Sequence, residues 1–111
     1  MSIASDLIRG NTETIILAHL AEHDSYGYEI NKAIQQKTAG QYELKEATLY
    51  AAFRRLEEAG AIASYWGDET TGARRRYYAI TTRGRIMLSR LKVEWKTAKE
   101  LIDILIAEEV S

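Results

Sequence analysis

Apolar residues recur at helical spacing in the stretch from Leu44 to Gly60. Leu49, Phe53 and Leu56 follow one another at i, i+4 and i+7, so one side of a helix is committed to a core. Gly60 supplies a left-handed stop at the C-terminal end of this helix. The opposite side carries small residues, hydroxyls and guanidiniums, namely Thr48, Tyr50, Ala51, Arg54 and Arg55.

That opposite side suits the reading of a DNA groove. Small side chains let the backbone approach DNA, while hydroxyl and guanidinium groups reach phosphates and base edges. An ordinary solvated helix surface explains the same residues equally well. The next segment favours DNA reading over an ordinary surface, because a hairpin follows the helix. Two strand-like stretches, Ile62 to Trp66 and Arg74 to Ile80, flank a turn at 67–72. Together they predict a winged helix-turn-helix: a mainly α fold with a β-hairpin wing.

Side chains alternate along the second predicted strand. Arg74 and Arg76 therefore lie on one face and Arg75 lies on the other. Ile80 should face the core, which places Tyr78 and Arg76 on the core side and Arg75 outward. Only part of this arginine run can touch one groove.

Two helices are predicted before the groove-reading candidate. Asp6 to Ala21 has more apolar surface than one narrow stripe needs, so this helix should pack on two sides. Asp24 or Ser25 can cap a second helix that runs to about Lys37. One further face of the first helix either lines a cavity or is an ordinary solvated face, and its residues are Leu7, Asn11, Thr14 and Ala18.

Tyr26, Gly27 and Tyr28 fall in the first turn of the second helix. Free amides and tyrosine hydroxyls at a helix start can hydrogen-bond a phosphate. The two tyrosines could instead be core residues with hydrated tips. We therefore expect one tyrosine to pack and the other to face DNA.

Thr81 can cap a final helix that runs to about Glu108 without a breaker, roughly 40 Å at 1.5 Å per residue. Its apolar residues repeat at intervals of 3 and 4, a heptad seam that calls for a partner helix. A helix folded back on its own domain cannot bury all of them, so a homodimer is expected. We divide the chain into a DNA-binding unit, 1–82, and a dimerisation helix, 83–111, packed with the first helix. The seam is Leu88, Leu91, Trp95, Ala98, Ile102 and Leu105.

Charge is unevenly distributed along the 111 residues. The net charge of −1 is unusual for a DNA-binding domain, but residues 44–90 carry 9 Lys and Arg against 5 Asp and Glu, and both flanks are negative. The chain has no Cys, and no stretch approaches the roughly 18 apolar residues of a membrane span. We expect one soluble, cytoplasmic domain without membrane contact.

His19 and His23 are four residues apart, which on a helix puts two imidazoles in reach of one metal ion. No third ligand of the HExxH kind is present, and His23 falls where the helix ends. We therefore expect a surface His pair, no metal and no other cofactor. With no Cys, no Gly-rich phosphate loop and no recognisable Ser, His and carboxylate set, the protein is not expected to be an enzyme.

The chain carries several short motifs: Tyr26-Gly27-Tyr28, Ala47-Thr48-Leu49-Tyr50, Arg55-Leu56-Glu57 with Gly60, Gly72 with Arg74-Arg75-Arg76-Tyr77-Tyr78, and Thr81-Thr82-Arg83-Gly84. Together they resemble the PadR family of bacterial transcriptional regulators, over nearly the whole chain. The C-terminal part is similar to the small subgroup that includes multidrug-sensing repressors of lactic acid bacteria. The resemblance implies a dimeric repressor that binds a palindromic operator in double-stranded DNA and releases it when a small molecule binds. A winged-helix module for protein contacts is the alternative.

The DNA-binding residues that we expect come from three predicted elements: the second helix, the reading helix and the wing. They are Tyr26, Thr48, Tyr50, Ala51, Arg54, Arg74 and Arg75. Of these, Tyr50, Arg54 and Arg75 should touch DNA directly.

Trp95 lies in the seam, where it would meet its own copy across a dimer axis. Two indoles about 7 Å apart leave a slot for one planar aromatic effector. In the multidrug-sensing relatives, a Trp at the matching place forms such a slot with the first helix as its rim. The lysines beside Trp95 would favour neutral or anionic aromatics over cationic dyes. Simple filling of the interface explains Trp95 equally well. The expected effector-binding residues are Trp95, Lys92, Lys99, Leu7, Asn11, Thr14 and Ala18.

Overall fold

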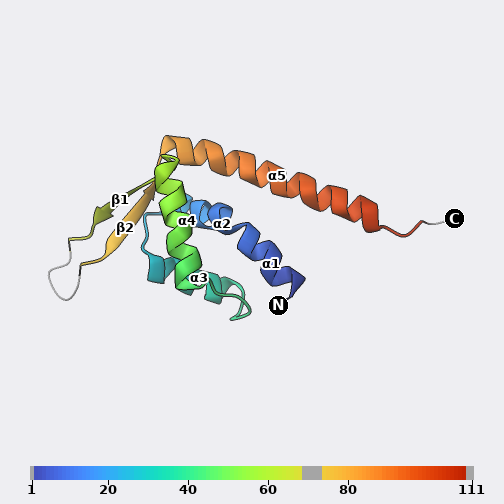
Figure 1. Cartoon of the computed structure of the whole chain (residues 1–111), viewed down its shortest axis with the longest axis horizontal. Coiled ribbons are helices and arrows are strands. Elements are labelled where there is room, and N and C mark those ends of the chain that lie inside the picture. Colours follow the sequence, from blue (N-terminus) through green and yellow to red (C-terminus); the bar gives the residue numbers. More distant parts are fainter. Residues whose placement is uncertain (1, 69–73, 110–111) are drawn as a thin grey trace.

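The computed structural model describes residues 2–68 and 74–109. Within them, four shorter helices precede a two-stranded hairpin and a long C-terminal helix (Figure 1). This order confirms the predicted fold class, a winged helix-turn-helix with a long terminal helix. The elements are α1 (Ile3–Gly10), α2 (Thr12–Glu22), α3 (Gly27–Lys37), α4 (Glu46–Glu58), β1 (Ile62–Trp66), β2 (Arg76–Ile80) and α5 (Thr82–Ile106).

The core lies where α2, α3 and α4 meet the base of the hairpin. Leu49, Phe53 and Leu56 of α4 are all buried, as their periodicity predicted. The ring of Phe53 stacks on that of Tyr78 in β2, with centroids 3.9 Å apart. The helix and the wing therefore share one core and are held in a fixed relation. Other large and fully buried apolar side chains include Ile16, Leu17, Leu20 and Ile30.

α4 has defined boundaries at both ends. Gly60 follows the helix with a φ of +72°, the left-handed conformation predicted for it. Before the helix, the side-chain amide of Asn31 donates to the Leu44 carbonyl and its oxygen accepts from the Leu44 amide, both at 2.8 Å. Asn31 thus ties the connection between α3 and α4 to α3, which sets where α4 begins.

The hairpin has the predicted alternation. β1 and β2 pair antiparallel, from Ile62 opposite Ile80 to Trp66 opposite Arg76. β2 begins at Arg76 and not at Arg74. The turn predicted at 67–72 lies largely outside the described residues. On its second edge, β2 bonds to Ser25, whose amide and carbonyl both pair with the backbone of Tyr78.

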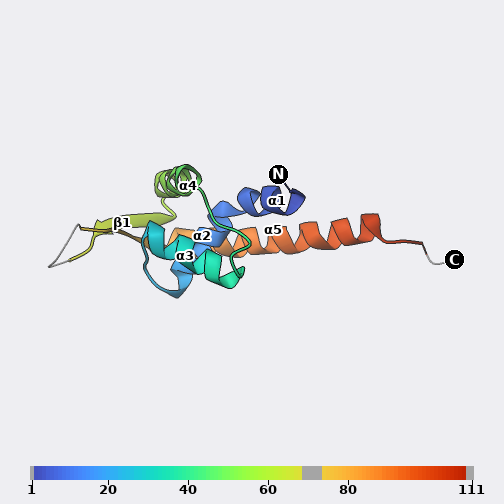
Figure 2. The ribbon, with the colours of Figure 1, turned by 90° about the horizontal axis from the view of Figure 1, so that it is seen from below.

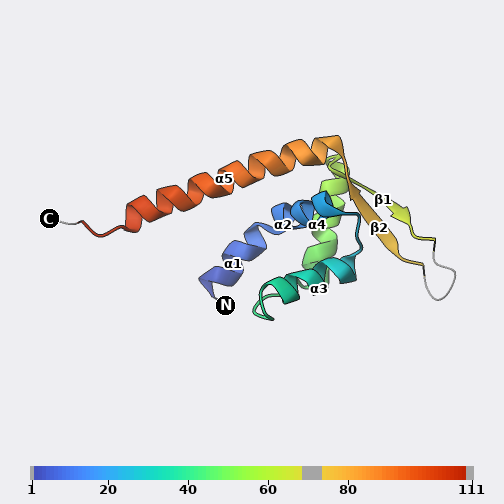
Figure 3. The same cartoon turned by 180° about the vertical axis from the view of Figure 1, so that it is seen from behind.

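The prediction of one helix from Asp6 to Ala21 is wrong, because the chain breaks at Asn11 into α1 and α2. The Asn11 side chain donates to the Leu7 carbonyl at 2.8 Å, and the Thr12 hydroxyl donates to the Arg9 carbonyl at 2.6 Å. These polar groups take up carbonyls that a continuous helix would use. α1 therefore runs in its own direction below α5 (Figure 3).

The predicted cap of α3 is also wrong. Tyr26 occupies the N-cap position without a side-chain cap bond. Asp24 instead accepts a hydrogen bond from the Tyr65 hydroxyl at 2.7 Å, which joins this turn to β1. Ser25 is fully buried and is committed to β2. The start of α3 is thus held by the wing and not by its own cap.

α5 begins as predicted, because the Thr81 hydroxyl accepts from the Gly84 amide. It packs on α2 and then continues well beyond the other helices (Figures 1 and 2). Its exposed part carries a row of large apolar residues, among them Leu101, Ile102, Leu105 and Ile106. No helix in the described part of the chain is long and apolar enough to cross a membrane.

Candidate nucleic-acid interface

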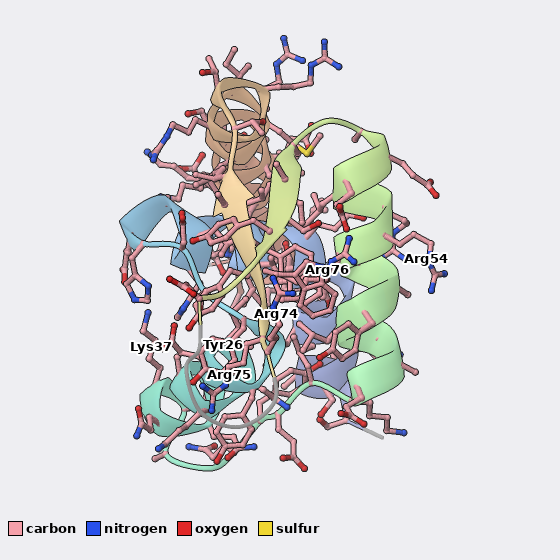
Figure 4. The ribbon with its side chains drawn as sticks, turned by 90° about the vertical axis from the view of Figure 1, so that its left-hand side faces the viewer. Tyr26, Lys37, Arg54, Arg74, Arg75 and Arg76 are labelled. Atoms are coloured by element: carbon pink, nitrogen blue, oxygen red, sulfur yellow. The ribbon has the colours of Figure 1, made fainter. Side chains whose placement is uncertain are left out.

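The outer side of α4 presents the residues predicted to read DNA. Tyr50 is 46 % exposed, Arg54 is exposed, and Thr48 and Ala51 are half-buried beside them. The Arg54 side chain projects from α4 on the side away from the hairpin (Figure 4). Thr48 and Ala51 are small, whereas Tyr50 and Arg54 are long side chains with polar ends.

A cleft of about 480 Å³ lies between the start of α3, α4 and the wing. It brings together four of the residues predicted for DNA binding from three separate elements. The three other lining residues, Gly27, Tyr28 and Arg76, were not in the predicted DNA-binding set. The lining residues are Tyr26, Gly27, Tyr28, Tyr50, Arg74, Arg75 and Arg76. Guanidiniums and tyrosine hydroxyls around one cleft are the groups that bind a phosphate backbone.

Aromatic contacts fix the wing against the start of α3. The Arg75 guanidinium lies over the Tyr26 ring, 4.9 Å from its centroid (Figure 4). The Tyr26 ring meets the edge of Tyr77, and Tyr77 stacks on Tyr65 with centroids 5.6 Å apart. The hydrogen bond to Asp24 raises the pKa of Tyr65 above its usual value, so its hydroxyl remains the donor at neutral pH.

The two tyrosines at the start of α3 differ in packing, and contact of either one with DNA stays a prediction. Tyr26 packs between Arg75 and Tyr77, whereas Tyr28 is 72 % exposed. Gly27 between them makes room for the reading helix, because an added Cβ would lie 2.8 Å from the Tyr50 hydroxyl. The Tyr50 hydroxyl is thereby held at the N-terminal end of α3.

Two arginines form ion pairs that the sequence did not reveal, so the arginines of this region have different surroundings. Arg55, next to Arg54, pairs with Glu13 of α2 at 2.7 Å and is not among the residues that line the cleft. Arg76 lies 3.6 Å from Glu57 and donates to the Ser64 hydroxyl at 2.7 Å, on the core side of the hairpin as predicted. No sequence spacing signals the Arg55 pair, since its partner lies 42 residues away.

An apolar pocket of about 420 Å³ lies between α1, α2 and α5. Five of the seven predicted effector residues line it, but Ala18 and Lys99 do not. Ala18 packs against the core, and Lys99 is exposed farther along α5. Lys92 is the charged side chain of the lining set. The full lining is Ala4, Leu7, Ile8, Asn11, Thr14, Ile15, Lys92 and Trp95.

A helix of small and polar outward residues, preceded by a helix and followed by an arginine-bearing hairpin, defines a winged helix DNA-binding protein. Comparison with known proteins then narrows this class. Residues 16–90 match the Transcriptional regulator PadR-like family. The chain belongs to this family.

Similar proteins extend the match over almost the whole chain. A transcriptional regulator from Clostridium thermocellum shares 49 % identity, with a TM-score of 0.86 over 96 % of this chain and 100 % of that one. A PadR family regulator from hypervirulent Clostridium difficile R20291 shares 35 % identity, with a TM-score of 0.73 over 87 % and 99 %. An uncharacterized "protein X" of Lysinibacillus sphaericus is 47 % identical over 102 residues, which are 92 % of this chain and 94 % of that one. Regulators of transcription are generally not enzymes.

Proposed function

We propose that the protein is a homodimeric repressor that binds a palindromic operator and leaves it when a planar aromatic molecule occupies the pocket beside Trp95. The observation that supports DNA binding is the cleft in which Tyr26 before α3, Tyr50 of α4, and Arg74 and Arg75 before β2 lie together. Arg54 extends this surface along α4. These residues are the proposed contacts, with Thr48 and Ala51 allowing close approach of the backbone.

The exposed apolar row on α5 supports the homodimer. Ile102 is 47 % exposed and Leu105 is 80 % exposed, although both belong to the heptad seam. A monomer leaves this seam in water, whereas a second α5 covers it by knobs-into-holes packing. A two-fold dimer also presents two copies of α4 to two half-sites about 34 Å apart, as a palindrome requires.

The pocket beside Trp95 supports effector binding. Its walls are almost entirely apolar, and Trp95 is 36 % exposed at its edge. An indole face and aliphatic walls suit a flat aromatic ring. Lys92 brings a positive charge, so neutral or anionic aromatics should bind better than cationic dyes. The pocket beside a tryptophan is the feature shared with the multidrug-sensing subgroup, whereas the preferred charge of the ligand would be the opposite.

Arg54 and Arg55 offer a matched test because they are neighbours on α4 with different surroundings. Full-length protein is titrated onto DNA from upstream of its own gene at several salt concentrations. Arg54→Ala and Arg75→Ala should each weaken binding and reduce the salt slope by about 0.9. Arg55→Ala removes the same charge from the Glu13 side and should leave the slope unchanged. Binding without salt dependence, or an equal effect of all three changes, would contradict the proposed interface and favour a protein-contact module.

A further inference from the structure

Two histidines and a carboxylate meet at the turn between α2 and α3. His19 lies in the last turn of α2, His23 is its C-cap, and Glu29 lies in the first turn of α3. One ligand atom of each residue lies within 4.8 Å of those of the other two. The sequence had suggested a surface His pair without a third ligand, but His19 is only 9 % exposed and Glu29 supplies the third group from the next helix.

Two imidazoles and one carboxylate are a donor set typical of Zn²⁺ sites that keep a fourth position for water. Ligands at 2.0–2.2 Å from a tetrahedral ion lie about 3.4 Å from one another. The side chains of His23 and Glu29 are 56 % and 41 % exposed. Both can therefore rotate to bring their ligand atoms from within 4.8 Å to about 3.4 Å of one another. His19, held in the core, provides the fixed point.

Neighbouring groups already orient these side chains. The buried Ser25 hydroxyl donates to Glu29 Oε1 at 2.5 Å and lies 3.2 Å from His19 Nε2. His23 Nδ1 lies 2.8 Å from the Asp24 carbonyl oxygen, which leaves Nε2 outside that contact. A carbonyl on the second ring nitrogen, as at His23, is a common way to hold a metal-binding histidine. An ion bound at His19 Nε2 would replace the contact of that nitrogen with Ser25.

The charges around His19 suit a metal ligand. The carboxylates of Glu29 and Glu22 favour a cation here, and the ammonium of Lys37 opposes it.

We propose that His19, His23 and Glu29 bind a divalent transition-metal ion, for which Zn²⁺ is the best match, at the turn between α2 and α3. The residues inside this turn hold the wing, since Ser25 pairs with Tyr78 of β2 and Asp24 accepts from Tyr65 of β1. A bound ion therefore joins the end of α2 to the start of α3 and fixes the turn that carries the wing. This site is separate from the DNA-binding cleft and from the pocket beside Trp95.

The test uses the full-length protein after removal of metal with a chelator. Calorimetric titration with ZnCl₂ should give one ion per chain, and Co²⁺ should develop the visible absorption of a low-coordinate site. His23→Gln and Glu29→Gln should each weaken Zn²⁺ binding at least about tenfold. His23 is exposed and Glu29 is partly exposed, and Gln keeps an oxygen that can accept from Ser25, so the metal-free variants should keep the wild-type circular dichroism spectrum. Zn²⁺ should raise the melting temperature of the wild type and leave that of both variants unchanged.

Glu22→Gln is the matched control, because it removes a carboxylate that also acts on His19 but is not one of the three ligands. Its Zn²⁺ affinity should stay within about twofold of the wild type. Absence of saturable binding would overturn the site. Wild-type affinity in Glu29→Gln, or an equal loss in Glu22→Gln, would overturn the ligand assignment, because binding would then follow the His pair alone or the net charge.

Discussion

The guanidinium of Arg75 rests on the ring of Tyr26, 4.9 Å from its centroid, so a wing residue and the residue before α3 form one unit. This contact places the arginine beside the cleft. Such a pair contributes about 0.5–1 kcal/mol at an exposed site. In a double-mutant cycle on operator affinity, Arg75→Ala and Tyr26→Leu should therefore couple by that amount. Tyr26→Phe keeps the ring and should combine additively with Arg75→Ala; a cycle without coupling for Tyr26→Leu would refute the positioning role.

The reading helix depends on Asn31 for its starting point. Asn31→Leu leaves the Leu44 amide and carbonyl without their partner, so unfolding by urea should show a loss of about 2 kcal/mol. Operator affinity should fall as well, because the start of α4 is no longer fixed. Gln35→Ala removes an exposed hydrogen bond to Glu43 at the same connection and should change stability by less than about 0.5 kcal/mol. Equal effects of the two changes would argue against a special role for Asn31.

Two glycines should respond oppositely to the same substitution. A Cβ on Gly84 would lie 2.1 Å from the Ala61 carbonyl oxygen, so α5 would have to move away from the hairpin base. Gly84→Ala should cost at least about 3 kcal/mol in thermal or urea unfolding. Gly10→Ala meets nothing within 4 Å and should be neutral or stabilise by up to about 1 kcal/mol. A well-tolerated Gly84→Ala would show that this contact is not rigid.

The proposed dimer can be dissociated without touching the core. Replacing Ile102 and Leu105 with Glu puts two charges into the seam, and the protein should sediment as a monomer with an intact helical spectrum. Truncation after Arg90 should also give a monomer, although it removes Leu91, which packs against the core, and part of the helical signal. Either change should greatly weaken operator binding. Ile102→Leu preserves the apolar surface and should remain dimeric. An unchanged dimer after truncation would exclude the α5 seam as the interface.

Trp95 can report on the pocket once the second tryptophan is removed. In a Trp66→Phe background, a neutral or anionic aromatic ligand should quench Trp95 fluorescence saturably. Lys92→Gln should weaken an anionic ligand and leave a neutral one unchanged, because only the former uses the ammonium. A Trp95 signal that no member of a broad aromatic panel alters would reduce this residue to a packing role.

The sequence predicted best where local pattern and tertiary packing agree. The limits of β1, the left-handed Gly60, the Thr81 cap and the buried stripe of α4 all follow from short-range rules. The alternation in the hairpin placed Arg76 on the side of Glu57, but it did not predict that Arg74, Arg75 and Arg76 would all line one cleft. Each of these features depends only on neighbours in sequence and on which side faces the core.

Most of the failed predictions have one physical origin, competition from partners distant in sequence. Asp24 accepts a hydrogen bond from Tyr65, Ser25 pairs with the backbone of Tyr78, and Arg55 forms an ion pair with Glu13. None of these pairings can be recognised from neighbouring residues in the sequence. The break at Asn11 is different, because its cause is local. The Gly10-Asn11-Thr12 run carries polar groups that compete for backbone carbonyls, but the apolar periodicity of α2 masks it.

Because α5 extends past the rest of the protein, the pairing of two α5 helices would also set the distance between the two DNA-binding units. In a dimer joined through this helix, a slip of one heptad along the seam moves one DNA-binding unit by about 10.5 Å relative to the other. That displacement equals roughly three base pairs at 3.4 Å each. A slipped dimer would still be helical and well packed, yet its two reading helices would miss a fixed palindrome. Trp95 is the only tryptophan in the seam and is the residue best suited to keep the two helices in register. Alignment of the two reading helices with the operator would therefore depend on Trp95, which makes no contact with DNA in this arrangement.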